Sequence, residues 1–176
     1  VEGLSDFEKE AFVYAFGSKG AVQCGFCIPG MVMSGKALID KNPNPTEADI
    51  KEAIKGNICR CTGYKKIIEA IDLAAQIKRG DRQIDKELEK GDKFGVGSNA
   101  FRIDVREKVL GYGEYCDDVE MEDMLHVSAV RTKYPRARIL DIDFSEALKL
   151  DGVVAVYTAE DVPNNKVGHI QQDWDV

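Results

Sequence analysis

Apolar residues recur at helical spacing over the first part of the chain, up to about residue 78. The motif SDFE at residues 5–8 is typical of a capping box, and apolar residues follow on one helical face: Phe7, Ala11, Tyr14 and Ala15. Pro29 suits the first turn of a second helix, which the run NPNP at 42–45 ends. Two helices are therefore predicted before residue 45.

Two more helices are predicted between residues 46 and 78. The motif TEAD at 46–49 caps the third helix, and Gly56 with Asn57 ends it. The fourth begins near Tyr64 and carries apolar residues along one side: Ile67, Ile68, Ile71, Ala74 and Ala75. Four helices with short connections predict a compact bundle over residues 1–78. A domain of this size is near the limit for an apolar core alone, so a bound metal would help it fold.

The pattern changes twice after this bundle. Residues 79–98 are charged, contain glycine and have few apolar anchors, which predicts a linker; the alternative is a solvated helix over QIDKELEK at 83–90. Residues 99–176 alternate apolar and polar positions in strand-like stretches, and short helical turns lie between them. These stretches are MLHVSAVRT at 124–132, RILDIDF at 138–144 and GVVAVYT at 152–158, with turns at SEALKL (145–150) and TAEDV (158–162). The predicted class of the whole chain is α+β.

Composition and charge narrow the possible partners. Charged residues make up 31% and hydrophobic residues 44% of the chain, and the formal net charge is −7 without a basic stripe, which argues against nucleic acid. No apolar run approaches the ~20 residues that cross a bilayer, so no membrane partner is expected. The N-terminus VEGLSD lacks the features of a signal peptide, and a cytoplasmic location is expected. It also lacks an initiator Met, and QQDWDV has no natural end signal, so we expect a segment of something longer.

Four of the five cysteines form two close pairs, a C-x2-C of Cys24 and Cys27 and a C-x-C of Cys59 and Cys61. In a reducing compartment, clustered cysteines are more often metal ligands or redox groups than disulfides. Each pair is predicted to lie in a turn at a helix N-terminus, where free N–H groups and the helix dipole stabilise negative sulfur. Small or polar neighbours would let the backbone approach a cluster closely: Gly25, Thr62 and Gly63.

Three kinds of site remain compatible with this spacing. An iron–sulfur cluster and a structural zinc ion each take four thiolates. A redox dithiol would use Cys24 and Cys27 alone and would leave the second pair unexplained. The C-x-C spacing slightly favours iron and sulfur over zinc. The fifth cysteine, Cys116, has no partner in the sequence and is interpreted as a small packed apolar residue.

The segments around both cysteine pairs resemble the helical [2Fe-2S] domain of the molybdenum hydroxylases, the family of xanthine dehydrogenase and aldehyde oxidoreductase. The resemblance covers about residues 4–75 and rests on AVQCGFCIPGMVMSGKALI and NPTEADIKEAIKGNICRCTGYKKIIEAI. Later stretches look like the opening of the molybdopterin-binding part of the same family, where an α/β hammerhead domain begins. These are FRIDVREKVLGYGEYCDD, MLHVSAVRT, ARILDIDFSEAL and GVVAVYTAEDVP.

The resemblance implies roles for particular residues. The four iron ligands would be Cys24, Cys27, Cys59 and Cys61. Gln23 would hydrogen-bond the pterin, and Cys61 would touch the pterin amino group; the alternative for Gln23 is a surface residue at a helix end. Arg60 would either stabilise a reduced cluster or form a surface ion pair. No catalytic residue is assigned.

The function implied is electron transfer within a larger oxidoreductase. In the family, electrons pass from the molybdopterin centre through this cluster to a ferredoxin-like [2Fe-2S] domain, and then usually to FAD. Those domains would be partners of this segment, which alone would not turn over substrate. The substrate would be a purine or a related heterocycle or aldehyde, with the terminal NNKVGHIQQDWDV favouring the purine branch. The family often has a Ser-Pro-His-Ala-His type run where this chain has KYPRAR at 133–138. The alternative function is a zinc-stabilised interaction module without a redox role.

Overall fold

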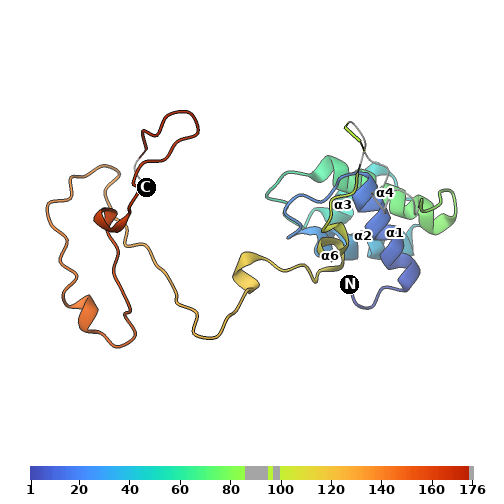
Figure 1. The fold of residues 1–176 in the computed structure, drawn as a ribbon. Coiled ribbons are helices and arrows are strands. Elements are labelled where there is room, and N and C mark those ends of the chain that lie inside the picture. Colours follow the sequence, from blue (N-terminus) through green and yellow to red (C-terminus); the bar gives the residue numbers. More distant parts are fainter. Residues whose placement is uncertain (86–94, 97–99, 175–176) are drawn as a thin grey trace. The chain divides into compact units, whose positions relative to one another are not determined.

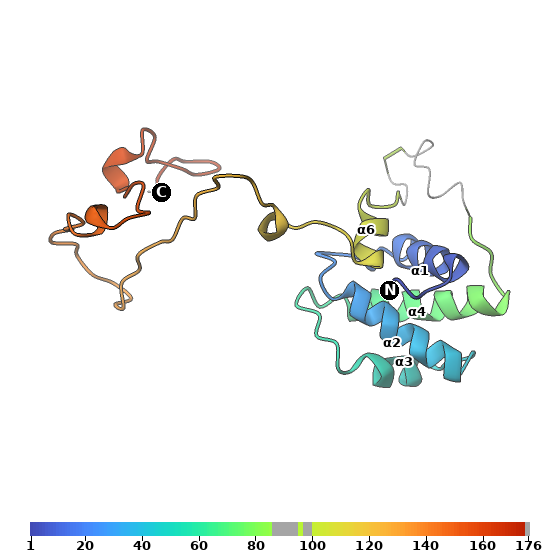
Figure 2. The ribbon, with the colours of Figure 1, turned by 90° about the horizontal axis from the view of Figure 1, so that it is seen from below.

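The computed structural model describes residues 1–85, 95–96 and 100–174 of the chain. These residues fall into two compact units, Val1–Met124 and Leu125–Val176. The first unit contains the helices and both cysteine pairs, and Figures 1 and 2 show it from two directions.

The four predicted helices are present in the first unit. They are α1 (Asp6–Ser18), α2 (Ile28–Lys41), α3 (Glu47–Ile54) and α4 (Tyr64–Arg79). The predicted capping box of Ser5 with Glu8 is formed, and the predicted cap of the third helix is also a capping box, of Thr46 with Asp49. The first amides of α1 and α3 therefore have side-chain acceptors. Helix α4 ends at Gly80, whose left-handed conformation at a φ of 86° is a common helix stop.

Among the described residues the first unit also contains α6 (Val105–Leu110), which was not predicted from the sequence. It packs against α1 and α2, while α4 packs against α1, α2 and α3 (Figure 2). Arg106 of α6 pairs with Glu10 of α1 at 2.5 Å. Phe101 lies close over Gly17 of α1, where an added Cβ would meet the ring at 2.6 Å. The segment beginning near residue 100 is therefore part of the helical unit.

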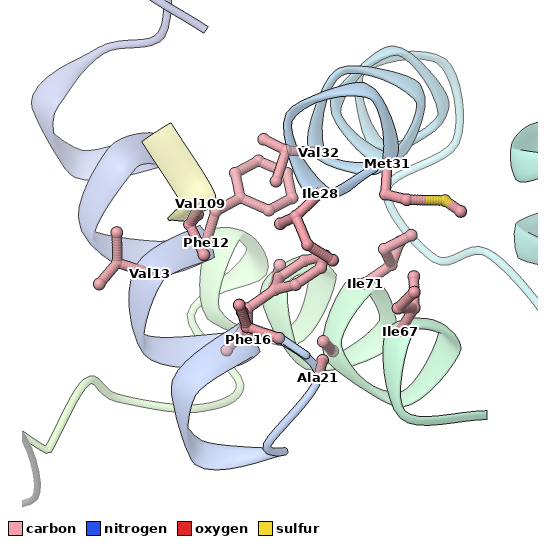
Figure 3. Packing of buried hydrophobic residues seen from close by; sticks show 14 of the residues in the cluster. Phe12, Val13, Phe16, Ala21, Ile28, Met31, Val32, Ile67, Ile71 and Val109 are labelled. Carbon is pink, nitrogen blue, oxygen red and sulfur yellow. The ribbon is translucent and has the colours of Figure 1, made fainter. Parts of the chain in front are cut away.

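The core of the first unit lies between α1, α2 and α4. Figure 3 shows Phe12 and Phe16 pointing from α1 toward Ile28 of α2 and Ile71 of α4. Val109 of α6 belongs to the same cluster and is completely buried. Burial of side chains of this size contributes about 1.5–3 kcal/mol each relative to exposure. This packing fixes the N-termini of α2 and α4, where the two cysteine pairs lie.

A charged network joins three helices on the surface of this core. The carboxylate of Glu8 accepts a hydrogen bond from the Ser5 N–H at 3.0 Å, and it pairs with Lys36 of α2 at 3.2 Å and Lys78 of α4 at 3.0 Å. These contacts favour the ionised carboxylate. The backbone hydrogen bond from Ser5, followed by the bonds from Lys78 and Lys36, lowers the pKa of Glu8 to about 2.

The second unit differs from the sequence prediction. Its residues form short 3-10 turns, η2 (Ala147–Lys149) and η3 (Ala159–Asp161), close to the predicted helical turns. The three predicted strands are not formed: among the described residues the β-pairing is a single antiparallel bridge between Val167 and Trp174. Strands need hydrogen-bonded neighbours and a face to bury, and here Val127 stays 96% and Leu140 88% exposed. The α+β class is not confirmed by the fold of this chain.

The predicted domain limits stay a prediction, although the first compact unit extends to Met124, beyond the expected boundary at residue 98. Residues 86–94 and 97–99, which make up much of the predicted linker and of the alternative helix over 83–90, lie outside the described residues. Among the helices that are described, none has both the length and the apolar composition that a bilayer crossing requires.

Replacing Glu8 by Gln should reduce the acid sensitivity of the first unit. The pKa of Glu8 is lower in the folded chain than its ordinary value of 4.5, so the unfolded state binds more protons at acidic pH. This contribution is fully present above pH 4.5 and is lost as the pH falls toward about 2. Urea unfolding followed by helical circular dichroism should therefore give Glu8→Gln a flatter dependence of unfolding free energy on pH in this window. An unchanged slope would contradict the network.

Candidate metal centre

The first cysteine pair lies in the loop that enters α2. Cys27 is the N-cap residue of this helix and Pro29 lies in its first turn, as the sequence predicted. Cys24 is exposed and Cys27 is partly buried. Gly25 between them is in the left-handed region with a φ of 91°, a conformation that glycine adopts without steric cost. The loop can therefore turn tightly enough to direct both thiols toward the same side.

The second cysteine pair lies in the loop that enters α4. Cys59 is 8% exposed, and its backbone N–H donates to the Tyr64 hydroxyl at 2.9 Å. The same hydroxyl donates to the Asn57 carbonyl at 3.1 Å, so one side chain closes the loop. Thr62 has a φ of 56°, which is unusual for a β-branched residue. In this turn the Gly63 N–H donates to Cys59 Sγ at 3.4 Å.

The second loop is also fixed to α2. Asn57 donates through its side-chain amide to the Ser34 hydroxyl at 2.7 Å. Its amide oxygen lies so close to Gly30 that a Cβ there would meet it at 2.6 Å. The two cysteine loops thus share one support, because α2 carries the first loop at its N-terminus and holds the second through Ser34.

The four thiols come together in two cross-loop pairs. The Cys24 and Cys61 thiols lie close enough to influence each other's ionisation, and so do the Cys27 and Cys59 thiols. The pKa of Cys24 is lowered, mainly by a backbone hydrogen bond from Phe26 and then by the Cys61 thiol. Burial raises the pKa of Cys27 to about 12, and the neighbouring Cys59 reinforces the rise. A metal cation that takes the place of the proton favours the ionised form of such a thiol.

The two thiol pairs supply the candidate sulfur donors for a metal centre at this site. In the described part of the chain, no group of three or more His, Cys, Asp and Glu side chains is arranged to hold one metal ion. The four thiols instead lie two and two, with backbone N–H donors at Cys24 and Cys59. Four thiolates, close backbone approach and N–H···S hydrogen bonds are the features that hold and tune a [2Fe-2S] cluster. The two pairs lie at the N-termini of neighbouring helices, and their assignment as the four ligands of one centre stays a prediction.

Gln23 also lies at this site, immediately before the first cysteine. Its side chain is exposed, and its amide nitrogen is 3.4 Å from the Cys61 carbonyl oxygen, which accepts the hydrogen bond. This bond connects the two cysteine loops directly. The predicted pair of Gln23 and Cys61 is thus brought together by the fold.

Several residues around the site were missed by the sequence analysis. Tyr64 was predicted only as the start of a helix. Arg102, Lys108 and Tyr115 all contact the first cysteine loop, although they lie far along the chain. No local pattern marks them, because their role depends on how α6 packs on α1 and α2. Arg60, which the sequence placed next to two cysteines, is exposed.

Two family models match the chain. Residues 1–72 match the [2Fe-2S] binding domain, and residues 110–175 match the a/b hammerhead domain of aldehyde oxidase and xanthine dehydrogenase. Both cysteine pairs and the whole of the predicted second loop fall in the first match. Arg102 and Lys108 fall between the two matches.

Curated relatives and solved structures agree with the two family models. The chain is 38% identical over 150 residues to an aldehyde oxidoreductase of Megalodesulfovibrio gigas, an alignment that covers 81% of this chain and 16% of that protein. It is 48% identical over 77 residues to the nicotinate dehydrogenase small FeS subunit of Eubacterium barkeri, covering 43% of this chain and 49% of that subunit. The crystal structure of an aldehyde oxidoreductase from Desulfovibrio desulfuricans superposes with a TM-score of 0.67 at 36% identity, covering 89% of this chain and 18% of that one. The chain thus spans less than half the length of each of these proteins.

The hydroxyl of Tyr64 can be tested for its part in closing the second loop. Tyr64→Phe leaves the buried Cys59 N–H without its acceptor, so we expect the unfolding free energy to fall by about 1–3 kcal/mol. Tyr112→Phe is the matched control, because Tyr112 is 59% exposed and its change should stay within about 0.5 kcal/mol. Urea titrations of both variants at equal metal loading measure the difference. Equal stability of the two variants would show that the hydroxyl does not hold the loop.

Proposed function

The chain belongs to the family of molybdenum hydroxylases that includes aldehyde oxidoreductase and xanthine dehydrogenase, and we propose that it is the electron-transfer segment of such an enzyme. The observation that carries the proposal is the meeting of four thiols from two loops at the N-termini of α2 and α4. The [2Fe-2S] cluster that they would hold supplies one-electron transfer. We assign Cys24, Cys27, Cys59 and Cys61 as its ligands.

The pairing of the thiols supports a division of the ligands between two irons. Cys24 with Cys61 would hold one iron, and Cys27 with Cys59 would hold the other. Each iron would then take one ligand from each loop. If one loop moved away, each iron would still be bound to the other loop by one cysteine. A structural zinc ion would need all four sulfurs around one point, and it is the alternative that metal analysis tests.

The chain contributes positioning and hydrogen bonds to this chemistry. The Gly63 N–H at Cys59 Sγ and the backbone donor of Phe26 at Cys24 would stabilise the more negative, reduced state. Burial of Cys59 and partial burial of Cys27 keep water from one side of the site. The exposed side, with Cys24 and Gln23, is the side on which a pterin could approach.

The cofactors and partners outside this chain form the wider part of the proposal. Molybdopterin would contact Gln23 and Cys61, while a ferredoxin-like [2Fe-2S] domain and an FAD domain would lie on other parts or subunits of the enzyme. The nicotinate dehydrogenase relative is named as a small FeS subunit, which supports a division among subunits. The relatives include both aldehyde oxidoreductase and a probable xanthine dehydrogenase subunit, so the proposed substrate remains a purine, a related heterocycle or an aldehyde. A cytoplasmic location is likewise proposed.

Metal analysis tests the cluster directly. The purified chain should contain about two irons and two inorganic sulfides, with visible absorption that dithionite bleaches and a spin-half electron paramagnetic resonance signal on reduction. Cys59→Ser should remove iron and colour, whereas Cys116→Ser, the matched control at an exposed cysteine, should keep both. A colourless chain that holds zinc in place of iron would support the interaction module instead.

Gln23→Ala tests the proposed pterin contact in the assembled enzyme. The variant loses the amide that faces Cys61 but keeps the backbone carbonyl, so the iron content should stay normal while the molybdopterin content falls. Gln76→Ala is the control, because the amide of Gln76 bonds Asp72 within α4 at 2.7 Å. Molybdopterin content equal to that of the control would remove Gln23 from the pterin site.

A further inference from the structure

The segment from Arg102 to Tyr115 has a role that the four cysteines do not explain. It meets the loop Gln23–Phe26 at three successive positions: the Gln23 carbonyl, the Cys24 carbonyl and Gly25, where an added Cβ would meet Lys108. The [2Fe-2S] domain match ends at residue 72, before this segment begins. The loop that bears Cys24 is therefore held by residues of the same compact unit that lie beyond the matched stretch.

Arg102 makes the first of these contacts. Its guanidinium forms a two-armed ion pair with Asp104, including a bond of 2.8 Å from Nη2 to Oδ2, and its Nη1 donates to the Gln23 carbonyl oxygen. Asp104 thereby fixes the plane of the guanidinium, and the charge of Arg102 acts on the nearby Cys24 sulfur. Arginine is suited to this task because its planar fork can serve two acceptors at once.

Lys108 makes the second contact. It is buried, with only 7% of its surface exposed, which is unusual for a lysine. Its methylene chain packs against Gly25, where an added Cβ would lie 2.7 Å from the lysine Cδ. Its ammonium lies 3.4 Å from the centre of the Tyr115 ring and donates to the Glu114 carbonyl at 3.2 Å. A buried cation with a ring and one carbonyl as partners keeps a positive charge beside the loop.

Tyr115 makes the third contact. Its hydroxyl donates to the Cys24 carbonyl at 3.1 Å, and its ring meets the Phe26 ring edge to face at a centroid distance of 5.9 Å. Tyr115 therefore connects Lys108, on one face of its ring, to the two residues around Gly25. The three side chains together cover the loop from Gln23 to Phe26.

We propose that Arg102, Lys108 and Tyr115 form a clamp that positions the first cysteine loop, and that Arg102 and Lys108 raise the reduction potential of the cluster. The proposal rests on the proposed function, because it takes the four cysteines as cluster ligands. An all-thiolate two-iron cluster is anionic and gains one more negative charge on reduction. The guanidinium of Arg102 near Cys24 and the ammonium of Lys108 against the same loop stabilise the reduced form more than the oxidised form. The clamp also limits the motion by which the loop would open to water.

The potential is tested in the iron-loaded chain with Arg102→Gln. A redox titration followed by electron paramagnetic resonance should give a more negative potential for this variant than for the wild type. Arg106→Gln is the matched control, since Arg106 is a cation of the same segment that pairs with Glu10 on α1. Arg102→Lys keeps the charge without the fork and should return the potential toward the wild-type value. A potential in Arg102→Gln equal to that in Arg106→Gln would overturn the electrostatic role.

The positioning role is tested by hydrogen exchange, which does not depend on the metal that the cysteines hold. In Arg102→Gln and in Arg102→Lys the amides of residues 24–27 should exchange about tenfold faster, which is the expected effect of losing one charged hydrogen bond. Gly25→Ala should have a similar effect because its Cβ displaces Lys108, whereas Gly80→Ala has a similar positive φ but open space around it. Unchanged exchange in the loop of these variants would overturn the clamp. A wild-type chain without iron would overturn the proposed function and the potential shift, and the exchange rates would still decide the clamp.

Discussion

The approach of four thiols from two separate loops is the constraint on which the rest of the helical unit depends. Without a metal, such a group of sulfurs is unfavourable to ionise, and burial raises the pKa of Cys27 to about 12. The protein offsets this cost by fixing both loops at the N-termini of packed helices, where N–H groups face the sulfurs. The core between α1, α2 and α4 keeps the two helix ends in place, and Asn57 connects the second loop to α2. The fold of the first unit can thus be understood as a support for two short loops.

The helices were predictable because their signals are local. Two capping boxes, one proline in a first turn and one run of prolines mark their limits within a few residues, and the structure confirms these elements. The ligand set could also be predicted, from the cysteine spacing and the family resemblance. The fold places Cys24 near Cys61 and Cys27 near Cys59, and Gln23 bonds the Cys61 carbonyl. Their role as ligands stays a prediction that metal analysis must decide.

What the sequence did not predict depends on contacts between distant residues. Arg60 was considered as a cation that could stabilise a reduced cluster, because it lies between two cysteines. In the structure Arg60 is exposed, and the charge of Arg102 acts on Cys24. Tyr64, Lys108 and Tyr115 acquire their roles only once α4 and α6 are packed. The strands were predicted from the alternation of apolar and polar residues. This alternation indicates that one face of a strand could be buried, but it does not provide a neighbouring strand to pair with. In the described part of the second unit that pattern leaves Val127 and Leu140 exposed, although residues 110–175 match a hammerhead domain.

The central claim is that sulfurs from both loops hold two metal ions in cross-loop pairs. Anomalous diffraction at the iron edge, from crystals of the metal-loaded chain, locates each iron relative to the cysteines. The account predicts two peaks, one between the sulfurs of Cys24 and Cys61 and one between those of Cys27 and Cys59. A single metal peak surrounded by all four sulfurs would contradict it, as would two irons that each bind both cysteines of one loop.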